Sequence, residues 1–144
     1  MAHLIHSVLP MPPRPIIFIK PDDTVQKCID VMAEKTIGAL VVIDSDNKLV
    51  GIVSERDIVF SCLHKGFDIN KAKASDVVFT KVTVLSPHDL VEKAMQAMTQ
   101  TKRRHILIRD KDEYIAILSI GDLLLHLLDD RERVIEHLEN YIHT

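Results

Sequence analysis

Hydrophobic positions along the chain follow two periods, and these periods alternate in the same order twice. Residues 16–19 and 82–85 are short runs rich in β-branched residues, which favour strands. Each run is followed by apolar residues at every third or fourth position, the spacing of an amphipathic helix. These positions are Val25, Cys28, Ile29, Met32 and Ala33 in the first copy, and Val91, Ala94, Met95 and Met98 in the second.

Two apolar runs separated by a charged turn come after each of these helices. The runs are 40–43 and 49–53 in the first copy, and 106–108 and 114–118 in the second. Another helical pattern then closes each copy. The sequence therefore predicts the order β-α-β-β-α, twice, which is a mixed α/β (α+β) fold.

Polar residues and glycines mark the predicted ends of the helices. Residues 22–23 and 88–89 carry aspartates suited to cap the first helix of each copy, and residues 75–76 to cap one short helical turn. Gly38 and Gly66 follow the first and second helices, and glycine at that place readily ends a helix.

The two copies align residue by residue, as internal repeats do. Pro21 corresponds to Pro87 at an offset of 66 residues, and residues 51–57 correspond to 116–122 at an offset of 65. We expect repeat 1 at 10–66, a linker at 67–74 and repeat 2 at 75–144. Because a repeat of about sixty residues is marginally stable alone, we expect the two to pack about a pseudo-two-fold axis.

Composition narrows the class of protein. Hydrophobic residues are 47% of the chain and the formal net charge is -3, which argues against disorder and against nucleic-acid or membrane binding. No apolar run is long enough to cross a membrane. Residues 1–15 lack a basic segment and are rich in proline, so we expect an irregular arm and no targeting signal. The two cysteines have no metal-binding spacing, and we expect reduced core thiols and a cytoplasmic protein.

The repeated motifs resemble those of a tandem cystathionine-β-synthase (CBS) domain pair, or Bateman module. They are residues 35–42 and 51–57 in the first copy, and 103–108 and 117–122 in the second. Residues 134–142 resemble the tail of stand-alone bacterial pairs. The resemblance implies a non-catalytic regulatory module that binds an adenosyl ligand such as AMP, ATP or NAD in clefts between the repeats. It also implies a homodimer that senses energy or redox state and reports to an effector protein, whose identity the sequence does not give.

Two residue pairs carry the candidate chemistry, Ser54 with Asp57 and Ser119 with Asp122. Each pair lies where a strand passes into a helix, and the free N–H groups of a helix start favour an anion. The hydroxyl can donate to a phosphate or ribose oxygen, and the carboxylate can accept from both ribose hydroxyls. The same Ser-x-x-Asp spacing also forms a helix capping box, and both interpretations can hold together.

Further candidate contacts differ between the copies, so the two clefts are expected to be inequivalent. Small residues before a strand let a flat base approach the backbone, arginines attract phosphate, and glycine in a first helical turn admits a phosphate closely. His105 could stack on a base, or could equally be a partly buried structural residue. The candidates are Gly38, Ala39 and Arg56 in the first copy, and Arg104, His105 and Gly121 in the second.

Other functions have less support. The sequence contains no HExxH, P-loop or GxGxxG motif, and its histidines are scattered, so we expect neither catalysis nor a bound metal. The alternative function is a ligand-free dimerising scaffold that regulates a partner protein.

Two apolar stripes on the last helix bear on dimerisation. We expect the first to lie in the core, and the second to pack on a second subunit. The first stripe is Leu123, Leu124, Leu127 and Leu128, and the second is Val134, Ile135, Leu138 and Ile142.

Overall fold

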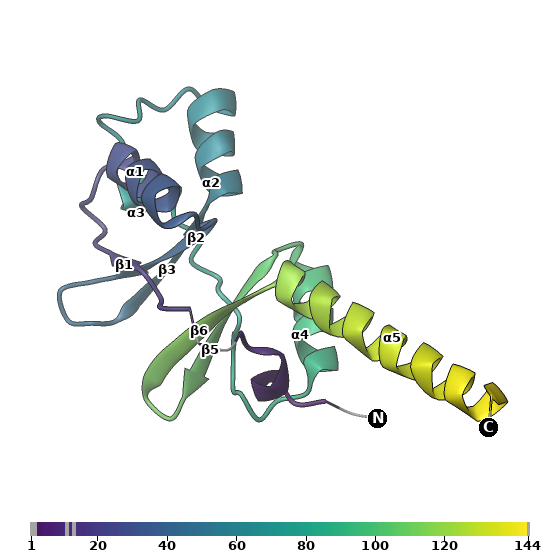
Figure 1. Ribbon diagram of the computed structural model, residues 1–144. Coiled ribbons are helices and arrows are strands. Elements are labelled where there is room, and N and C mark those ends of the chain that lie inside the picture. Colours follow the sequence, from purple (N-terminus) through teal and green to yellow (C-terminus); the bar gives the residue numbers. More distant parts are fainter. Residues whose placement is uncertain (1–2, 11, 13, 144) are drawn as a thin grey trace. The chain divides into compact units, whose positions relative to one another are not determined.

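The computed structural model describes residues 3–10, 12 and 14–143, and they form two compact units. One unit is residues 16–82, and the other combines the described part of residues 1–15 with residues 83–143. Each unit contains one three-stranded sheet with helices (Figure 1). The predicted mixed α+β fold with two copies of one order of elements is confirmed.

In the unit of residues 16–82, the strand order is β1-β2-β3. β1 pairs parallel with β2, and β2 pairs antiparallel with β3, with Ala39 opposite Ser54. The elements of this unit are β1 (Phe18–Ile19), α1 (Val25–Lys35), β2 (Ala39–Ile43), β3 (Leu49–Ser54), α2 (Glu55–Val59), the π-helical turn η2 (Phe60–His64) and α3 (Ala74–Val77).

The core of this unit joins the sheet to the apolar face of α1. Leu40, Val53 and Val25 are fully buried there, and Cys28 lies among them. Burial raises the pKa of the Cys28 thiol to about 11, so this thiol stays protonated and unreactive at neutral pH. Cys62 is half-buried against the same core, and burial raises the pKa of its thiol too. Both cysteines are free thiols, as expected.

The ends of α1 differ from the prediction. Thr24, and not Asp23, caps the helix: the N–H of Lys27 donates to Thr24 Oγ1 at 3.1 Å. Asp23 instead accepts from the N–H of Lys20 at 2.9 Å and so closes the preceding turn. At its other end, α1 stops at Thr36 in the left-handed conformation (φ 55°), two residues before Gly38. This conformation turns the next N–H, that of Ile37, back onto the Met32 carbonyl at 3.1 Å.

Two further helix ends follow the prediction in part. Gly66 follows the π-helical turn at φ +77°, as expected for a glycine that ends a helix. The short helix α3 begins after Lys73, whose N–H donates to the Asp76 carboxylate at 2.8 Å. Ser75 therefore lies inside α3 and does not cap it.

Residues 67–82 are part of the first unit. The N–H groups of Val25 and Gln26 donate to the carbonyls of Ala72 and Ile69, each at 2.9 Å. Further along, Ile52 in β3 and Phe79 exchange two backbone hydrogen bonds, at 3.0 and 2.9 Å. This pairing brings the Phe79 backbone so close to Gly51 that no side chain fits there: a Cβ on Gly51 would lie 2.1 Å from the Phe79 carbonyl oxygen.

The second unit repeats this plan, with strand order β4-β5-β6. Its β5 pairs parallel with β4 and antiparallel with β6. The fully buried side chains of Ile106, Ile108 and Leu118 form its core with α4. Its elements are η1 (Ile5–Val8), β4 (Val84–Leu85), α4 (Val91–Thr101), β5 (His105–Asp110), β6 (Glu113–Ser119) and α5 (Ile120–His143). The predicted cap of α4 is wrong: Leu90 precedes the helix, and Asp89 accepts from the N–H of Ser86 at 2.8 Å.

The N-terminal arm contributes to the second unit, which the sequence did not predict. Residues 5–8 form a 3-10 turn, η1, whose Ile5 is fully buried in the core of that unit. The arm is also held by its backbone. Ile5 N–H donates to the Asp89 carbonyl at 2.9 Å, and Val91 N–H donates to the His3 carbonyl at 2.9 Å. The arm is thus a packed element of this unit.

The long helix α5 exposes most of its leucines, against expectation. Leu123 is buried at 2% exposure, whereas Leu124, Leu127 and Leu128 are 41 to 59% exposed. The helix continues well past the sheet of its own unit (Figure 1), so its later turns have no sheet to cover them. Of the second stripe, Ile135 and Leu138 are exposed, and the side chains of Val134 and Ile142 lie outside the described part.

In the part of the chain that the structure describes, none of the helices combines the length and the apolar character that a membrane span requires.

Candidate functional site

The junction between β3 and α2 brings Ser54 and Asp57 together. Ser54 N–H donates to Asp57 Oδ2 at 3.1 Å, and Asp57 N–H donates to Ser54 Oγ at 3.3 Å. The Ser54 hydroxyl also donates to Asp57 Oδ2, at 2.8 Å. These bonds form a capping box, and they hold a carboxylate at the positive end of α2. The capping interpretation of this motif is therefore correct, and the ligand interpretation stays a prediction.

Gly38 and Ala39 lie at the same end of the first sheet. Ala39 pairs with Ser54 across β2 and β3, and Glu55 N–H donates to the Gly38 carbonyl at 3.1 Å. A Cβ on Gly38 would lie 3.5 Å from the Glu55 carboxylate, an ordinary contact, so packing does not require glycine here. The four residues Gly38, Ala39, Ser54 and Asp57 thus surround one strand–helix junction.

Arg56 points along α2 toward an aromatic ring. Its guanidinium carbon lies 5.6 Å from the centre of the Phe60 ring, four residues further along the chain. A cation over a ring face at this distance makes a weak attraction at an exposed site. Both residues are exposed. The predicted phosphate contact of Arg56 remains a prediction.

The second junction repeats the cap between β6 and α5. Ser119 N–H donates to Asp122 Oδ2 at 2.9 Å, and Asp122 N–H donates to Ser119 Oγ at 3.2 Å. The neighbours are also equivalent in position, because His105 pairs with Ser119 and the Ile120 N–H donates to the Arg104 carbonyl at 2.9 Å. The duplication in the sequence is therefore a duplication of backbone geometry.

Side chains at the second junction differ from those at the first. Arg104 is exposed and His105 is half-buried, where the first junction has Gly38 and Ala39. At Gly121, a Cβ would meet only Ser119 Oγ, at 3.5 Å, so this glycine is not forced by packing. The larger and more basic neighbours support the expectation that the two junctions are inequivalent.

Arg14 is a site residue that sequence reasoning missed. Its Nη2 lies 2.9 Å from Asp122 Oδ1 and 2.7 Å from Asp122 Oδ2, so one guanidinium nitrogen bonds both carboxylate oxygens. The side chain of Asp122 is 12% exposed and that of Arg14 is 55% exposed. Arg14 lies in the proline-rich arm, 108 positions from Asp122, and no local pattern links them.

Comparison with known proteins agrees with this duplicated geometry. The model of the CBS domain family matches twice, at residues 8–64 and 74–129. The mitochondrial CBS domain-containing protein CBSX3 of Arabidopsis thaliana is 32% identical over 126 residues, which cover 84% of this chain and 61% of that protein. The chain therefore spans less than two thirds of this relative.

Solved structures with two CBS domains have the same fold. A CBS-domain protein from Burkholderia ambifaria MC40-6 is 30% identical, with a TM-score of 0.80 over 90% of this chain and 96% of that one. The CBS-domain-containing protein ATU1752 from Agrobacterium tumefaciens is 26% identical, with a TM-score of 0.78 over 86% and 92% of the two chains. With two matched repeats and two equivalent strand–helix junctions, the chain belongs to the CBS domain family as a tandem pair.

Proposed function

We propose that the strand–helix junctions of this regulatory CBS pair bind an adenine nucleotide of the AMP, ATP or NAD class. The observation that carries the proposal is the capped Ser and Asp pair, which occurs with the same backbone geometry in both units. In this proposal the chain is a non-catalytic sensor of energy or redox state. Its output goes to a separate effector protein.

The capping bonds occupy only some of the hydrogen-bond acceptor positions of the Asp57 carboxylate. An ionised carboxylate offers about four acceptor positions on two oxygens, and the Ser54 N–H and hydroxyl both donate to the same oxygen of Asp57. In the proposal, the carboxylate that caps the helix also accepts from the ribose hydroxyls. Charge-assisted bonds of this kind are about twice as strong as neutral ones.

Arg14 opposes nucleotide binding at the second junction. A ribose at Asp122 would compete with a guanidinium that already bonds both carboxylate oxygens. Displacing it removes a charge-assisted ion pair, which opposes nucleotide binding at this junction.

A thermal-shift panel with AMP, ADP, ATP, NAD⁺, NADH and S-adenosylmethionine tests the proposal. Ligand at a hundred times its dissociation constant stabilises the folded state by about 2.7 kcal/mol, which raises the unfolding midpoint by several degrees in a domain of this size. We expect a rise with at least one adenosyl ligand. Protein shown by its ultraviolet spectrum to carry no nucleotide, and not stabilised by any of the six, would favour the ligand-free scaffold.

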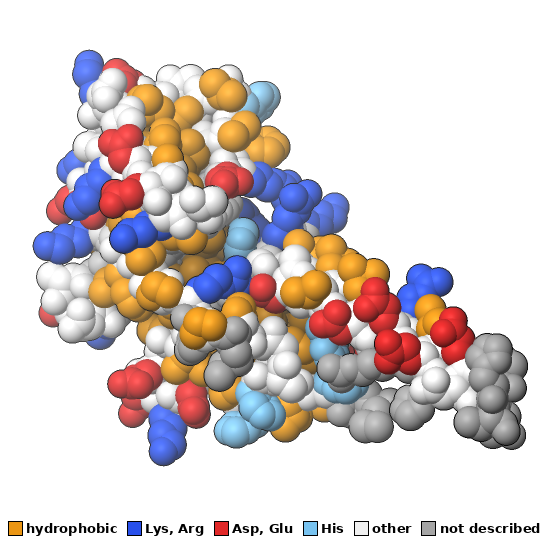
Figure 2. Space-filling view, viewed as in Figure 1, with side chains coloured by type: hydrophobic (Ala, Val, Ile, Leu, Met, Phe, Trp, Pro, Cys, Tyr) orange, Lys and Arg blue, Asp and Glu red, His pale blue; other side chains and the backbone are white. Residues whose placement is uncertain are grey.

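The exposed face of α5 supports pairing of two copies of this chain. Leu124, Leu128, Ile135 and Leu138 are 46 to 59% exposed and fall at spacings of four, seven and three, as in a coiled-coil seam. Figure 2 shows hydrophobic side chains gathered over the first turns of α5. We therefore propose that this seam, defined by these four residues, packs against the same seam of a second copy.

Sedimentation at micromolar concentration tests the pairing. The chain is expected to be a dimer, and Leu128→Glu with Ile135→Glu is expected to give monomers, because charge in an apolar seam opposes association. Leu63→Glu is the matched control, because Leu63 is 81% exposed on η2 and lies outside the seam. A monomeric parent chain, or a dimer that the seam substitutions leave intact, would contradict the proposal.

A further inference from the structure

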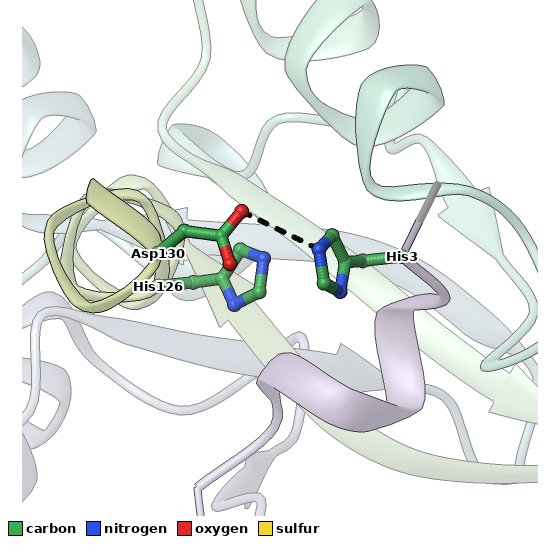
Figure 3. Close-up of side chains that lie close together, drawn as sticks. All are labelled: His3, His126 and Asp130. Atoms are coloured by element: carbon green, nitrogen blue, oxygen red, sulfur yellow. Dashed lines mark ion pairs between the residues drawn. The ribbon is translucent and has the colours of Figure 1, made fainter. Parts of the chain in front are cut away.

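Three side chains that the proposed function does not use lie together in the second unit (Figure 3). They are His3 from the N-terminal arm, and His126 and Asp130 from α5. His3 Nε2 lies 3.4 Å from Asp130 Oδ2, and the two imidazole rings are edge to face with their centres 4.7 Å apart. One ligand atom from each of the three residues lies within 4.8 Å of the other two.

The backbone holds all three residues in place. His126 and Asp130 are four residues apart on one helix, so they lie on the same face of α5. His3 is fixed from the other side, because its carbonyl accepts from Val91 N–H at 2.9 Å and the adjacent Leu4 pairs with Leu90. Ile5, two residues on, is buried in the core. The cluster therefore does not depend on a loose chain end.

A simple ion pair accounts for only part of this arrangement. The pair of His3 and Asp130 does not include His126, whose ring contacts His3 edge to face. Two imidazoles and one carboxylate are, in contrast, a common ligand set for Zn²⁺ at catalytic and open sites, with water as the fourth ligand. Mg²⁺ and Ca²⁺ take oxygen ligands almost entirely, so the two histidines favour a transition metal.

The distances agree with a site that closes slightly around the ion. Tetrahedral zinc with bonds of about 2.0–2.2 Å separates its ligand atoms by roughly 3.4 Å. His3 and Asp130 already have that separation, at 3.4 Å. The remaining pairs, within 4.8 Å, reach it by a rotation of side chains that are all only half-buried or more open.

We propose that His3, His126 and Asp130 bind one divalent transition-metal ion, Zn²⁺ in particular, with water completing the coordination. The ion would join the N-terminal arm to α5. This inference is independent of nucleotide binding, because none of the three residues belongs to either strand–helix junction.

Titration of the tag-free chain with zinc chloride by calorimetry, after removal of metal with a chelator, tests the site. We expect one ion per chain, bound with a dissociation constant in the micromolar range or below. His126→Ala and Asp130→Asn should each weaken binding at least tenfold, and neither is expected to prevent folding, since both positions are on a partly exposed helix. Substituting Co²⁺ should give the strong visible absorption of a four-coordinate ion.

His6→Ala is the matched control, because His6 is an exposed histidine on the same arm and lies outside the cluster. It should bind zinc as the parent chain does. The proposal fails if zinc does not bind stoichiometrically, if the His126→Ala and Asp130→Asn chains bind it as well as the parent, or if His6→Ala loses affinity equally. Magnesium chloride in place of zinc chloride should give no binding, and equal affinity for Mg²⁺ would also overturn the assignment.

Discussion

Replacing Gly51 by alanine is expected to destabilise the chain by about 3 kcal/mol or more. The added Cβ would lie 2.1 Å from the Phe79 carbonyl oxygen, 2.9 Å from its carbonyl carbon and 2.7 Å from Val78 Cγ2. Phe79 cannot retreat without breaking its two backbone hydrogen bonds to Ile52. Because the nearest clashing atom belongs to the backbone and not to a flexible side chain, a small side-chain movement cannot relieve the strain. Urea unfolding followed by circular dichroism measures the loss.

Gly38→Ala separates this effect from the general effect of adding a methyl group to a glycine. A Cβ at Gly38 meets the Glu55 carboxylate at 3.5 Å and no closer atom. We expect that variant to stay within about 1 kcal/mol of the parent chain. A Gly51→Ala chain as stable as the Gly38→Ala chain would show that residues 78–79 do not pack on β3 as described.

Asp57→Ala is expected to lower the affinity for the adenine nucleotide at the first junction by about 10- to 100-fold. The change removes charge-assisted bonds to the ribose, which contribute about 1.5–3 kcal/mol each. It also removes the carboxylate half of the capping box, which accepts from Ser54 N–H, so the free energy of unfolding should fall by about 1 kcal/mol. Calorimetric titration gives the affinity, and urea unfolding gives the stability.

Asp76→Ala is the matched control for Asp57→Ala. Asp76 caps α3 by accepting from Lys73 N–H at 2.8 Å, the same bond that Asp57 accepts from Ser54 N–H. Its loss should cost similar stability and leave nucleotide affinity unchanged. If both variants lost affinity in proportion to stability, the Ser and Asp motif would be a cap alone.

Arg14→Ala should raise the nucleotide affinity of the second junction, whereas Asp57→Ala should lower that of the first. Removing the guanidinium takes one hydrogen bond from each oxygen of Asp122 and should tighten nucleotide binding there. The nucleotide affinity of the first junction, which lies in the other compact unit, should stay unchanged and serves as the internal reference. Weaker binding at the second junction would instead make Arg14 a contact to the ligand's phosphate.

The order of elements could be predicted because it rests on local periodicity. The alternation of strand and helix patterns predicted the strands of both sheets and the first helix of each copy, α1 and α4. The strands predicted at 40–43 and 49–53 each differ from the observed strand by one residue. The Ser and Asp pairs were found because a capping box is a short-range motif. Their surroundings at each junction followed from strand register, as with Ala39 opposite Ser54.

Contacts between distant segments could not be predicted from the sequence. Arg14 and Ile5 look like parts of an irregular arm, because neither has a local pattern that points to Asp122 or to the second core. The leucines of α5 were misassigned for a related reason. Helical spacing shows which residues share a face, but burial depends on whether a sheet reaches that face, and only Leu123 is buried there.

The division of the chain into units has a consequence for the order of folding during synthesis. Residues 16–82 are contiguous, so the ribosome releases a complete unit before most of the second has been translated. The arm that carries Ile5 and Val8 leaves the ribosome before that unit, yet the residues that bury those side chains follow only after position 83. Throughout that interval the side chains of Ile5 and Val8 lack the core that covers them in the folded unit.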